Sequence, residues 1–167
     1  MIKTISQDTV VENKEFVDGG FYARFETYIL SPEEQIYSLL LQVNDYGKWL
    51  KGGAAKLQEK DTTARIHSHF NFHLGIWPFQ MQQKMRVVDM EQSRRMVFRL
   101  IHGDFVGQIE FKLKPYHDGS LVEMIWQRFY PQSLRAKLLM KPEIPTWHES
   151  LSNRFLMSLK KEVEKTR

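Results

Sequence analysis

Six stretches of alternating apolar and polar residues follow one another along the chain, and they constrain the fold more than any other feature. They cover residues 55–59, 64–74, 79–88, 95–101, 105–113 and 121–130. A period of two residues is typical of strands with one buried face. The connections between them, such as Lys60-Asp61 and His117-Asp118-Gly119-Ser120, are short and polar, as hairpins require. The sequence therefore predicts an antiparallel meander in a strongly curved sheet.

One more strand and several helices flank this meander. Phe21–Ile29 alternates in the same way and predicts a first strand. Ser31-Pro32-Glu33-Glu34 combines an N-cap serine, a proline in the first turn and a capping-box glutamate, which predicts the start of two short successive helices. After Pro131 we expect another short helix. A second capping box at Thr146-Trp147-His148-Glu149 opens a helix of about twenty residues, whose apolar residues recur at helical spacing.

The expected fold class is α+β, because only the long final helix can cover the concave face of such a sheet. A chain of 167 residues suits one domain with a real core. We therefore expect a single domain over residues 21–167, preceded by an N-terminal extension, residues 1–20, of uncertain structure. Within this extension, Phe16-Val17 before Asp18-Gly19-Gly20 fits a short strand and a tight turn.

From Phe21 to the C-terminus this layout resembles the START-like (SRPBCC) superfamily. The residues that carry the resemblance are Ser31-Pro32-Glu33-Glu34 with Ile36 and Tyr37, Asn44-Asp45-Tyr46-Gly47-Lys48-Trp49, and the stretch from Gly103-Asp104-Phe105 to Gly119-Ser120 with Trp126. Within the superfamily the chain is most similar to bacterial polyketide cyclase/dehydrase-like and lipid-transport-like proteins. The resemblance implies a helix-grip fold, in which a curved seven-stranded antiparallel sheet wraps around the C-terminal helix, and an internal cavity between the two.

Aromatic and methionine side chains dominate the faces that strand parity directs inward, and aromatic residues are 13% of the chain. The expected cavity lining is Phe25, Trp49, Phe70, Leu74, Phe79, Met81, Met85, Phe98, Phe111, Met124, Trp126, Arg128, Phe155 and Leu159. Methionine is flexible and polarizable, which suits a pocket for an irregular apolar guest. The alternative is that the same side chains fill a core and leave no cavity.

Polar side chains near these strands allow further interpretations. Arg128 shares the parity of Trp126, so its guanidinium either holds an anionic head group at the cavity mouth or lies in water. His67, His69 and His73 share the parity opposite to the apolar face. We expect them on the outer surface, although two histidines at this spacing are also compatible with a metal.

Basic residues form only short clusters, namely Arg94-Arg95 with Arg99, and Arg135 with Lys137 and Lys141. Their simplest interpretation is a solvated surface, and the alternative is transient contact with an anionic membrane surface. The net charge of +4 is scattered, so we expect no nucleic-acid partner.

The sequence thus predicts binding or transport of a hydrophobic small molecule, such as a lipid, an isoprenoid or a polyketide. One alternative is a cyclase/aromatase-type enzyme that uses the same cavity. The other is a co-chaperone-like protein-interaction module. No phosphate-binding loop, zinc-protease helix or nucleophile elbow occurs, and we expect no cofactor or metal. The absence of cysteine, of a signal-like segment and of about 18 consecutive apolar residues favours the cytoplasm. The oligomeric state is open.

Overall fold

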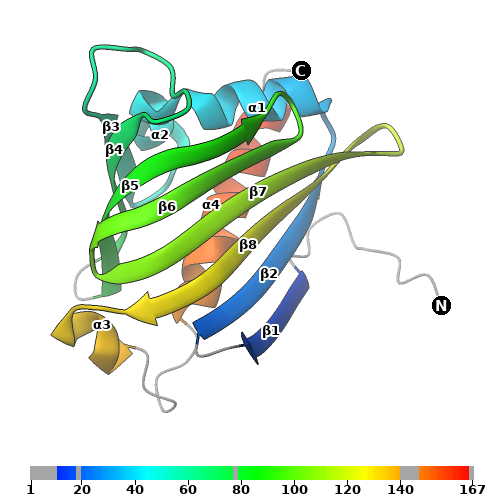
Figure 1. The fold of residues 1–167 in the computed structure, drawn as a ribbon. Coiled ribbons are helices and arrows are strands. Elements are labelled where there is room, and N and C mark those ends of the chain that lie inside the picture. Colours follow the sequence, from blue (N-terminus) through cyan, green and yellow to red (C-terminus); the bar gives the residue numbers. More distant parts are fainter. Residues whose placement is uncertain (1–10, 18–19, 77–78, 140–146, 166–167) are drawn as a thin grey trace.

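The computed structural model describes residues 11–17, 20–76, 79–139 and 147–165 (Figure 1). Its elements, in chain order, are β1 (Val11–Val17), β2 (Gly20–Ile29), α1 (Glu33–Leu41), η1 (Val43–Asp45), α2 (Tyr46–Trp49), β3 (Gly53–Leu57), β4 (His69–Ile76), β5 (Phe79–Glu91), β6 (Arg95–Gly103), β7 (Phe105–Tyr116), β8 (Gly119–Pro131), α3 (Leu134–Leu139) and α4 (Trp147–Lys165).

All strands join one antiparallel sheet of eight strands, in the order β1-β2-β8-β7-β6-β5-β4-β3. The seven strands predicted from residue 21 onward correspond to β2–β8, which confirms the meander. β1 adds an eighth strand at one edge, where Val17 pairs with Gly20 and Val11 pairs with Glu26. The sheet thus extends into the first twenty residues of the chain.

The sheet curves around α4, as the predicted helix-grip fold requires (Figure 1). The exposed fractions of Leu151, Phe155, Leu156 and Leu159 on α4 are all below 5%, because this face of the helix packs into the concave side of the sheet. Helices α1 and α2 lie across one end of the sheet, and α3 lies near the other end (Figure 1).

Two local boundaries differ from the sequence prediction. β4 begins at His69 instead of residue 64, because the backbone turns at Arg65–Ser68 and His67 adopts a φ of 73°. Helix α1 has Pro32 as its N-cap without a side-chain hydrogen bond, while the Ser31 hydroxyl donates to Gln35 Oε1 at 2.6 Å. The second predicted capping box begins at Thr146, which lies outside the described residues.

A β-bulge interrupts the pairing of β7 and β8 near the start of β7 and the end of β8. The register shifts between Val106 and Gln108, where Gly107 has a φ of 135°, and Arg128 opposite has a φ of 48°. A Cβ atom on Gly107 would lie 2.6 Å from the Arg128 carbonyl oxygen, so this position requires glycine. The bulge reverses the strand parity of the residues after it, with Phe129 buried and Tyr130 exposed.

None of the helices in the described segments is both long and apolar enough to cross a membrane.

Candidate ligand-binding site

A chain of aromatic rings crosses the interior from the sheet to α4. The ring centroids of Phe70 and Phe98 lie 5.3 Å apart, those of Phe98 and Phe111 5.9 Å, and those of Phe111 and Phe155 5.2 Å. The Trp49 ring also lies 5.6 Å from that of Phe155. Edge-to-face and tilted contacts at these distances are favourable beyond the burial of their surface. The rings therefore bind the final helix to the concave face.

A small void lies within this cluster, with a volume of about 20 Å³. Its lining is Tyr46, Phe70, Phe72, Leu74, Met81, Met85, Phe98, Ile109, Phe111, Met124, Trp126 and Phe155. One water molecule needs roughly 10–15 Å³ by this measure, and pockets for small molecules measure roughly 300–1,000 Å³. The side chains predicted to line an open cavity therefore nearly fill it in this conformation.

The structure brings most of the predicted lining residues to this void. Phe25 and Leu159 are fully buried elsewhere in the core, and Trp49 is half-buried at the edge of the ring cluster. Phe79 lies in β5, but its side chain is outside the described part of the chain.

Arg128 was included in the expected lining, with a position in water as the alternative, and the structure places it outside the residues that line the void. Its side chain is exposed, because the bulge gives the next inward position to Phe129. The Phe129 ring lies 4.6 Å from the ring of Trp126 and 4.4 Å from that of Phe105, so an apolar cluster occupies the place expected for the guanidinium.

Three residues that sequence analysis did not include also line the void, namely Tyr46, Phe72 and Ile109. Ile109 and Phe72 could have been found, because they share the parity of Phe111 and of Phe70. Tyr46 carried no such signal, since it follows a helix break. Its hydroxyl donates to the Leu40 carbonyl at 2.6 Å, and burial raises its pKa. The phenol therefore remains protonated and anchors α2 to α1.

Trp126 lines the void and carries an unpartnered polar atom. Its side chain is 1% exposed, and its indole N–H has no hydrogen-bond acceptor among the described residues. A buried donor without a partner is costly, by about 1–3 kcal/mol. The hydroxyls of Thr27 and Ser152 are buried in the same unpartnered state, but neither residue lines the void.

The predicted outer-surface histidines lie outside this interior. His67 and His73 are exposed and His69 is half-buried against Glu59, whose carboxylate lies 3.4 Å from its Nδ1. Among the described residues, no group of three or more His, Asp or Glu side chains is placed to hold a metal ion.

The predicted basic clusters are mostly paired with acids. Arg95 contacts Glu110 and Asp89, and its pKa is raised first by its hydrogen bond to Glu110. Arg94 contacts Glu91 at 3.4 Å, and Arg135 contacts Asp104. Lys141 lies outside the described residues. Pairing leaves these arginines less available to an anionic surface than the sequence suggested.

Comparison with known proteins supports the fold, and the similarity is one of structure, not of sequence. No protein-family profile and no curated protein matches the sequence. Among solved structures, TTHA0849 from Thermus thermophilus has a TM-score of 0.70 at 16% identity, covering 86% of this chain and 97% of its own. A START superfamily protein from Mycobacterium smegmatis has a TM-score of 0.70 at 13% identity, covering 87% and 99%. The Aha1 dimer from Colwellia psychrerythraea has a TM-score of 0.58 at 14% identity, covering 84% and 94%.

Proposed function

We propose that this chain, which has the START-like helix-grip fold, binds an apolar small molecule between its sheet and α4. The supporting observation is the unpartnered indole N–H of Trp126, a residue that lines a void with an otherwise apolar wall. A ligand with an apolar body and one carbonyl or hydroxyl oxygen would bury its body among the rings and supply the missing acceptor. Ligand pockets commonly combine such a lining with a few placed polar groups.

Binding would require the void to open. Met81, Met85 and Met124 line it, and methionine has three rotatable bonds and adapts to different shapes. Rotamer changes at these positions, with a displacement of neighbouring rings, would provide volume for a guest. The nearly filled interior is then the unliganded state, and the ligand stabilises a rarer open state.

The lining does not favour the cyclase alternative. Among the described residues at the void there is no carboxylate, imidazole or amine, and the Tyr46 hydroxyl is already bonded to a backbone carbonyl. General acid–base catalysis needs a titratable group within hydrogen-bond reach of the substrate. Binding without turnover is therefore the better interpretation.

The protein-interaction alternative has one observation in its favour, namely the small volume of the void. In this case the filled core is the functional state and the surface carries the activity. Exposed Leu134 and Leu138 on α3, with exposed fractions of 75% and 47%, would be the first apolar contacts to examine.

The test compares two isosteric aromatic probes, acetylnaphthalene and isopropenylnaphthalene, substituted at the same ring position. Only the first has an acceptor oxygen. We expect both to shift the methyl NMR signals of Met81, Met85 and Met124, and we expect the ketone to bind about fivefold more tightly through Trp126. Trp126→Phe should abolish this preference.

Trp49→Phe is the matched control, because it removes another buried, unpartnered indole N–H away from the void lining. It should leave the preference for the ketone unchanged. If neither probe moves the three methionine signals, and no apolar compound is extracted from the purified protein, the proposal fails and the interaction alternative stands.

A further inference from the structure

The outer face of the sheet has two halves with different charge patterns. Over β2, β8, β7 and β6, two buried glutamates neutralise the surrounding cations. Glu123 contacts Arg24 and Lys114, the latter at 3.0 Å, and Glu110 contacts Arg95. Both glutamates are almost fully buried, with exposed fractions of 2% and 3%. This half of the face is thus a compensated ion-pair network.

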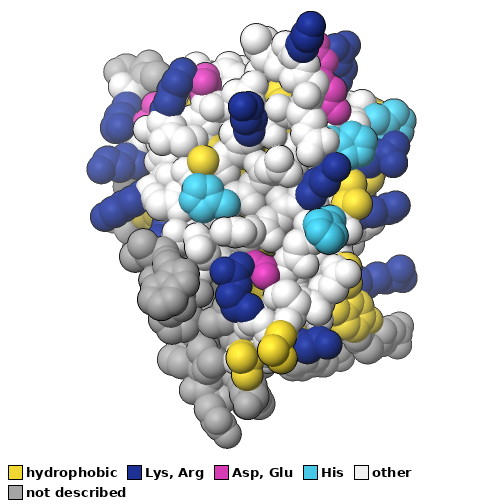
Figure 2. Space-filling view, turned by 90° about the vertical axis from the view of Figure 1, so that its left-hand side faces the viewer, with side chains coloured by type: hydrophobic (Ala, Val, Ile, Leu, Met, Phe, Trp, Pro, Cys, Tyr) yellow, Lys and Arg dark blue, Asp and Glu magenta, His cyan; other side chains and the backbone are white. Residues whose placement is uncertain are grey.

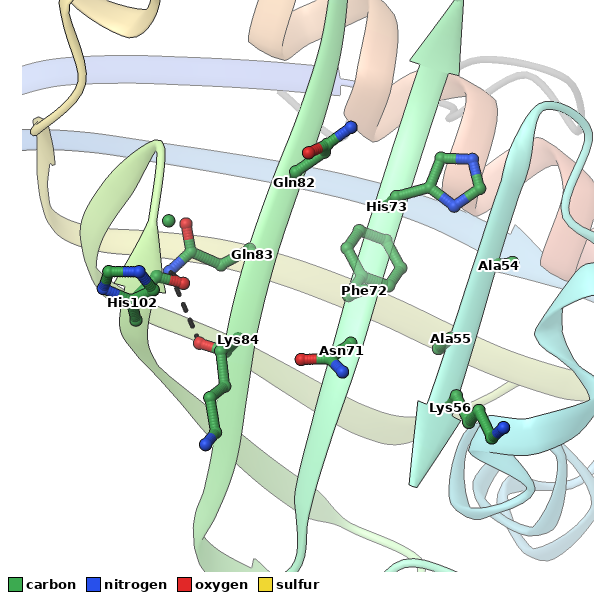
Figure 3. Close-up of a pocket in the computed structure, with 11 residues that line it drawn as sticks. Ala54, Ala55, Lys56, Asn71, Phe72, His73, Gln82, Gln83, Lys84 and His102 are labelled. Carbon is green, nitrogen blue, oxygen red and sulfur yellow. Dashed lines mark hydrogen bonds between the residues drawn. The ribbon is translucent and has the colours of Figure 1, made fainter. Parts of the chain in front are cut away.

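Over β3, β4, β5 and β6, the same face holds an open groove of about 600 Å³ (Figure 3). Its lining is Ala54, Ala55, Lys56, Asn71, Phe72, His73, Gln82, Gln83, Lys84, His102 and Gly103. None of these residues is acidic, and neither Lys56 nor Lys84 forms an ion pair within the described structure. Figure 2 views the side of the molecule where these strands lie, and Lys, Arg and His predominate over Asp and Glu on it.

Strand register sets four of these side chains in one transverse row. Lys56 lies opposite Asn71, Asn71 opposite Lys84, and Lys84 opposite His102. Neighbouring strands are about 4.8 Å apart, so the two lysines are separated by about 10 Å with an amide between them. Figure 3 shows Asn71 and Lys84 on the open side of β4 and β5.

A second row beside it places two arginines side by side. Arg86 lies directly opposite Arg99, and like charges in that position destabilise a sheet. The Arg86 Nη2 atom lies 2.9 Å from His67 Nδ1, and its buried Nε has no hydrogen-bond partner among the described residues. The protein thus maintains local repulsion here that an external anion would relieve.

We propose that this basic groove, defined by Lys56, Asn71, His73, Gln82, Lys84 and His102, binds an acidic, extended peptide segment of a partner protein. In the extended polyproline II conformation residues rise about 3.1 Å each, with three per turn, so carboxylates three residues apart face the same side and lie about 9 Å apart, close to the separation of the two lysines. The amides of Asn71 and Gln82 can donate to and accept from the peptide backbone between them.

The groove chemistry fits a peptide better than other polyanions. No Phe, Tyr or Trp side chain faces outward among the lining residues, since Phe72 is 7% exposed and belongs to the inner face. Single-stranded nucleic acids are usually bound with stacking on such rings. The lining also offers no large exposed apolar side chain that could enter a membrane. This inference is independent of the proposed interior ligand.

The experiment measures fluorescence anisotropy with a labelled peptide of about ten residues that carries Glu at every third position. A peptide with Gln at the same positions is the reference. We expect the acidic peptide alone to bind, and more weakly at about 200 mM than at about 50 mM NaCl. The double variant Lys56→Gln/Lys84→Gln should weaken binding about tenfold. Because neither lysine has an ion-pair partner in the described structure, the melting temperature of this variant should remain unchanged.

Arg94→Gln/Lys165→Gln is the matched control, since it removes two positive charges from exposed sites that are paired with Glu91 and Glu162. The affinity of this control variant for the acidic peptide should stay within about twofold of that of the parent protein. Equal weakening by both double variants would mean that net charge alone attracts the peptide, and the proposal would fail. It would also fail if a single-stranded oligonucleotide or an anionic vesicle, and not the peptide, bound through Lys56 and Lys84.

Discussion

At the scale of single residues, Glu59 shows how one carboxylate fixes the start of a strand. Its two oxygens accept from the backbone N–H of His69, at 2.9 Å and 3.2 Å, where β4 begins. Burial raises the pKa of Glu59, but the hydrogen bonds and charge of His69 lower it by more, so the net shift is downward.

A lowered pKa stabilises the fold only while the carboxylate is ionised. This contribution to the free energy of unfolding is complete when the pH is above 4.5, the ordinary pKa of the group. It is lost as the pH falls through the lower pKa of the folded state. Glu59→Gln should therefore reduce the free energy of unfolding at about pH 7 by about 0.5–1 kcal/mol, because the side chain is one-third exposed. The difference from the parent should disappear near pH 3 in urea titrations. A difference that persists there would contradict the assignment to the ionised carboxylate.

Whether a strand side chain faces the interior or the solvent could be predicted from parity, except where the backbone departs from regular pairing. Phe70, Phe98 and Phe111 face the interior as the alternation predicted. Arg128 does not, because the bulge opposite Gly107 inserts one extra residue into β8 and reverses the direction of the β8 side chains after it. A single sequence gives little warning of such a bulge, since the glycine could equally belong to a turn.

At the scale of elements, Asp104 connects three of them. Its carboxylate accepts from the Gln82 backbone N–H at 3.0 Å and from the Ser133 hydroxyl at 2.8 Å, and it also contacts Arg135. Its own carbonyl accepts from Gln132 N–H at 2.7 Å. One buried side chain thus attaches the segment leading into α3 to the β6–β7 turn and to β5.

Asp104→Asn should release α3 more than it destabilises the sheet. The amide has the same shape but cannot retain the charge-assisted bond to Arg135. Losing a hydrogen bond to a charged group lowers the stability by about 1.5–3 kcal/mol. We expect faster hydrogen exchange at Ala136 and Lys137, with slow exchange preserved in β7 and β8. Asp89→Asn is the control, because Arg95 keeps Glu110 when that partner is lost. Uniformly faster exchange would mean that Asp104 stabilises the whole domain instead of α3.

Most elements could be predicted because their apolar period matched their secondary structure over many residues. The start of β4 could not, because Ala64–Ser68 continues the alternation while its backbone is engaged elsewhere, with Ala64 N–H donating to Leu41. Tertiary contacts overrode the local pattern there. β1 was indicated only by the apolar pair Phe16-Val17 and the glycines after it, since its stabilisation comes from pairing with β2.

At the scale of the whole molecule, Phe155 connects α4 to three other elements of the fold. Its ring lies 5.8 Å from that of Tyr46, 6.4 Å from that of Phe72 and 5.2 Å from that of Phe111. These partners come from α2, β4 and β7, so a single side chain joins α4 to distant parts of the fold.

Phe155→Ala should reduce the free energy of unfolding by about 3–5 kcal/mol, because it removes a buried ring from a rigid environment. Total stabilities are about 5–15 kcal/mol, so the melting temperature should fall markedly. Guanidinium unfolding would measure the change. Asn153→Ala, on a half-exposed face of the same helix, is the control, and it should change the free energy of unfolding by less than about 0.5 kcal/mol. A small effect of Phe155→Ala would mean that α4 is held mainly by its other contacts.

The whole-molecule property that sequence could not predict is the volume of the interior. The composition of the lining was largely predictable from parity, but its volume depends on the rotamers that Met81, Met85 and the neighbouring rings adopt together. The same residues can line a cavity or fill a core, and only packing distinguishes the two.

The strand order has a consequence for how this chain reaches its native state. Every pair of neighbouring strands is consecutive along the chain except β2 and β8. Their pairing joins positions such as Arg24 and Glu123, which are 99 residues apart. The entropic penalty of closing a loop grows with its length, so this pairing is the slowest to form by chance. The hairpins from β3 to β8 can assemble first, and the arrival of β2 then commits the molecule to its topology.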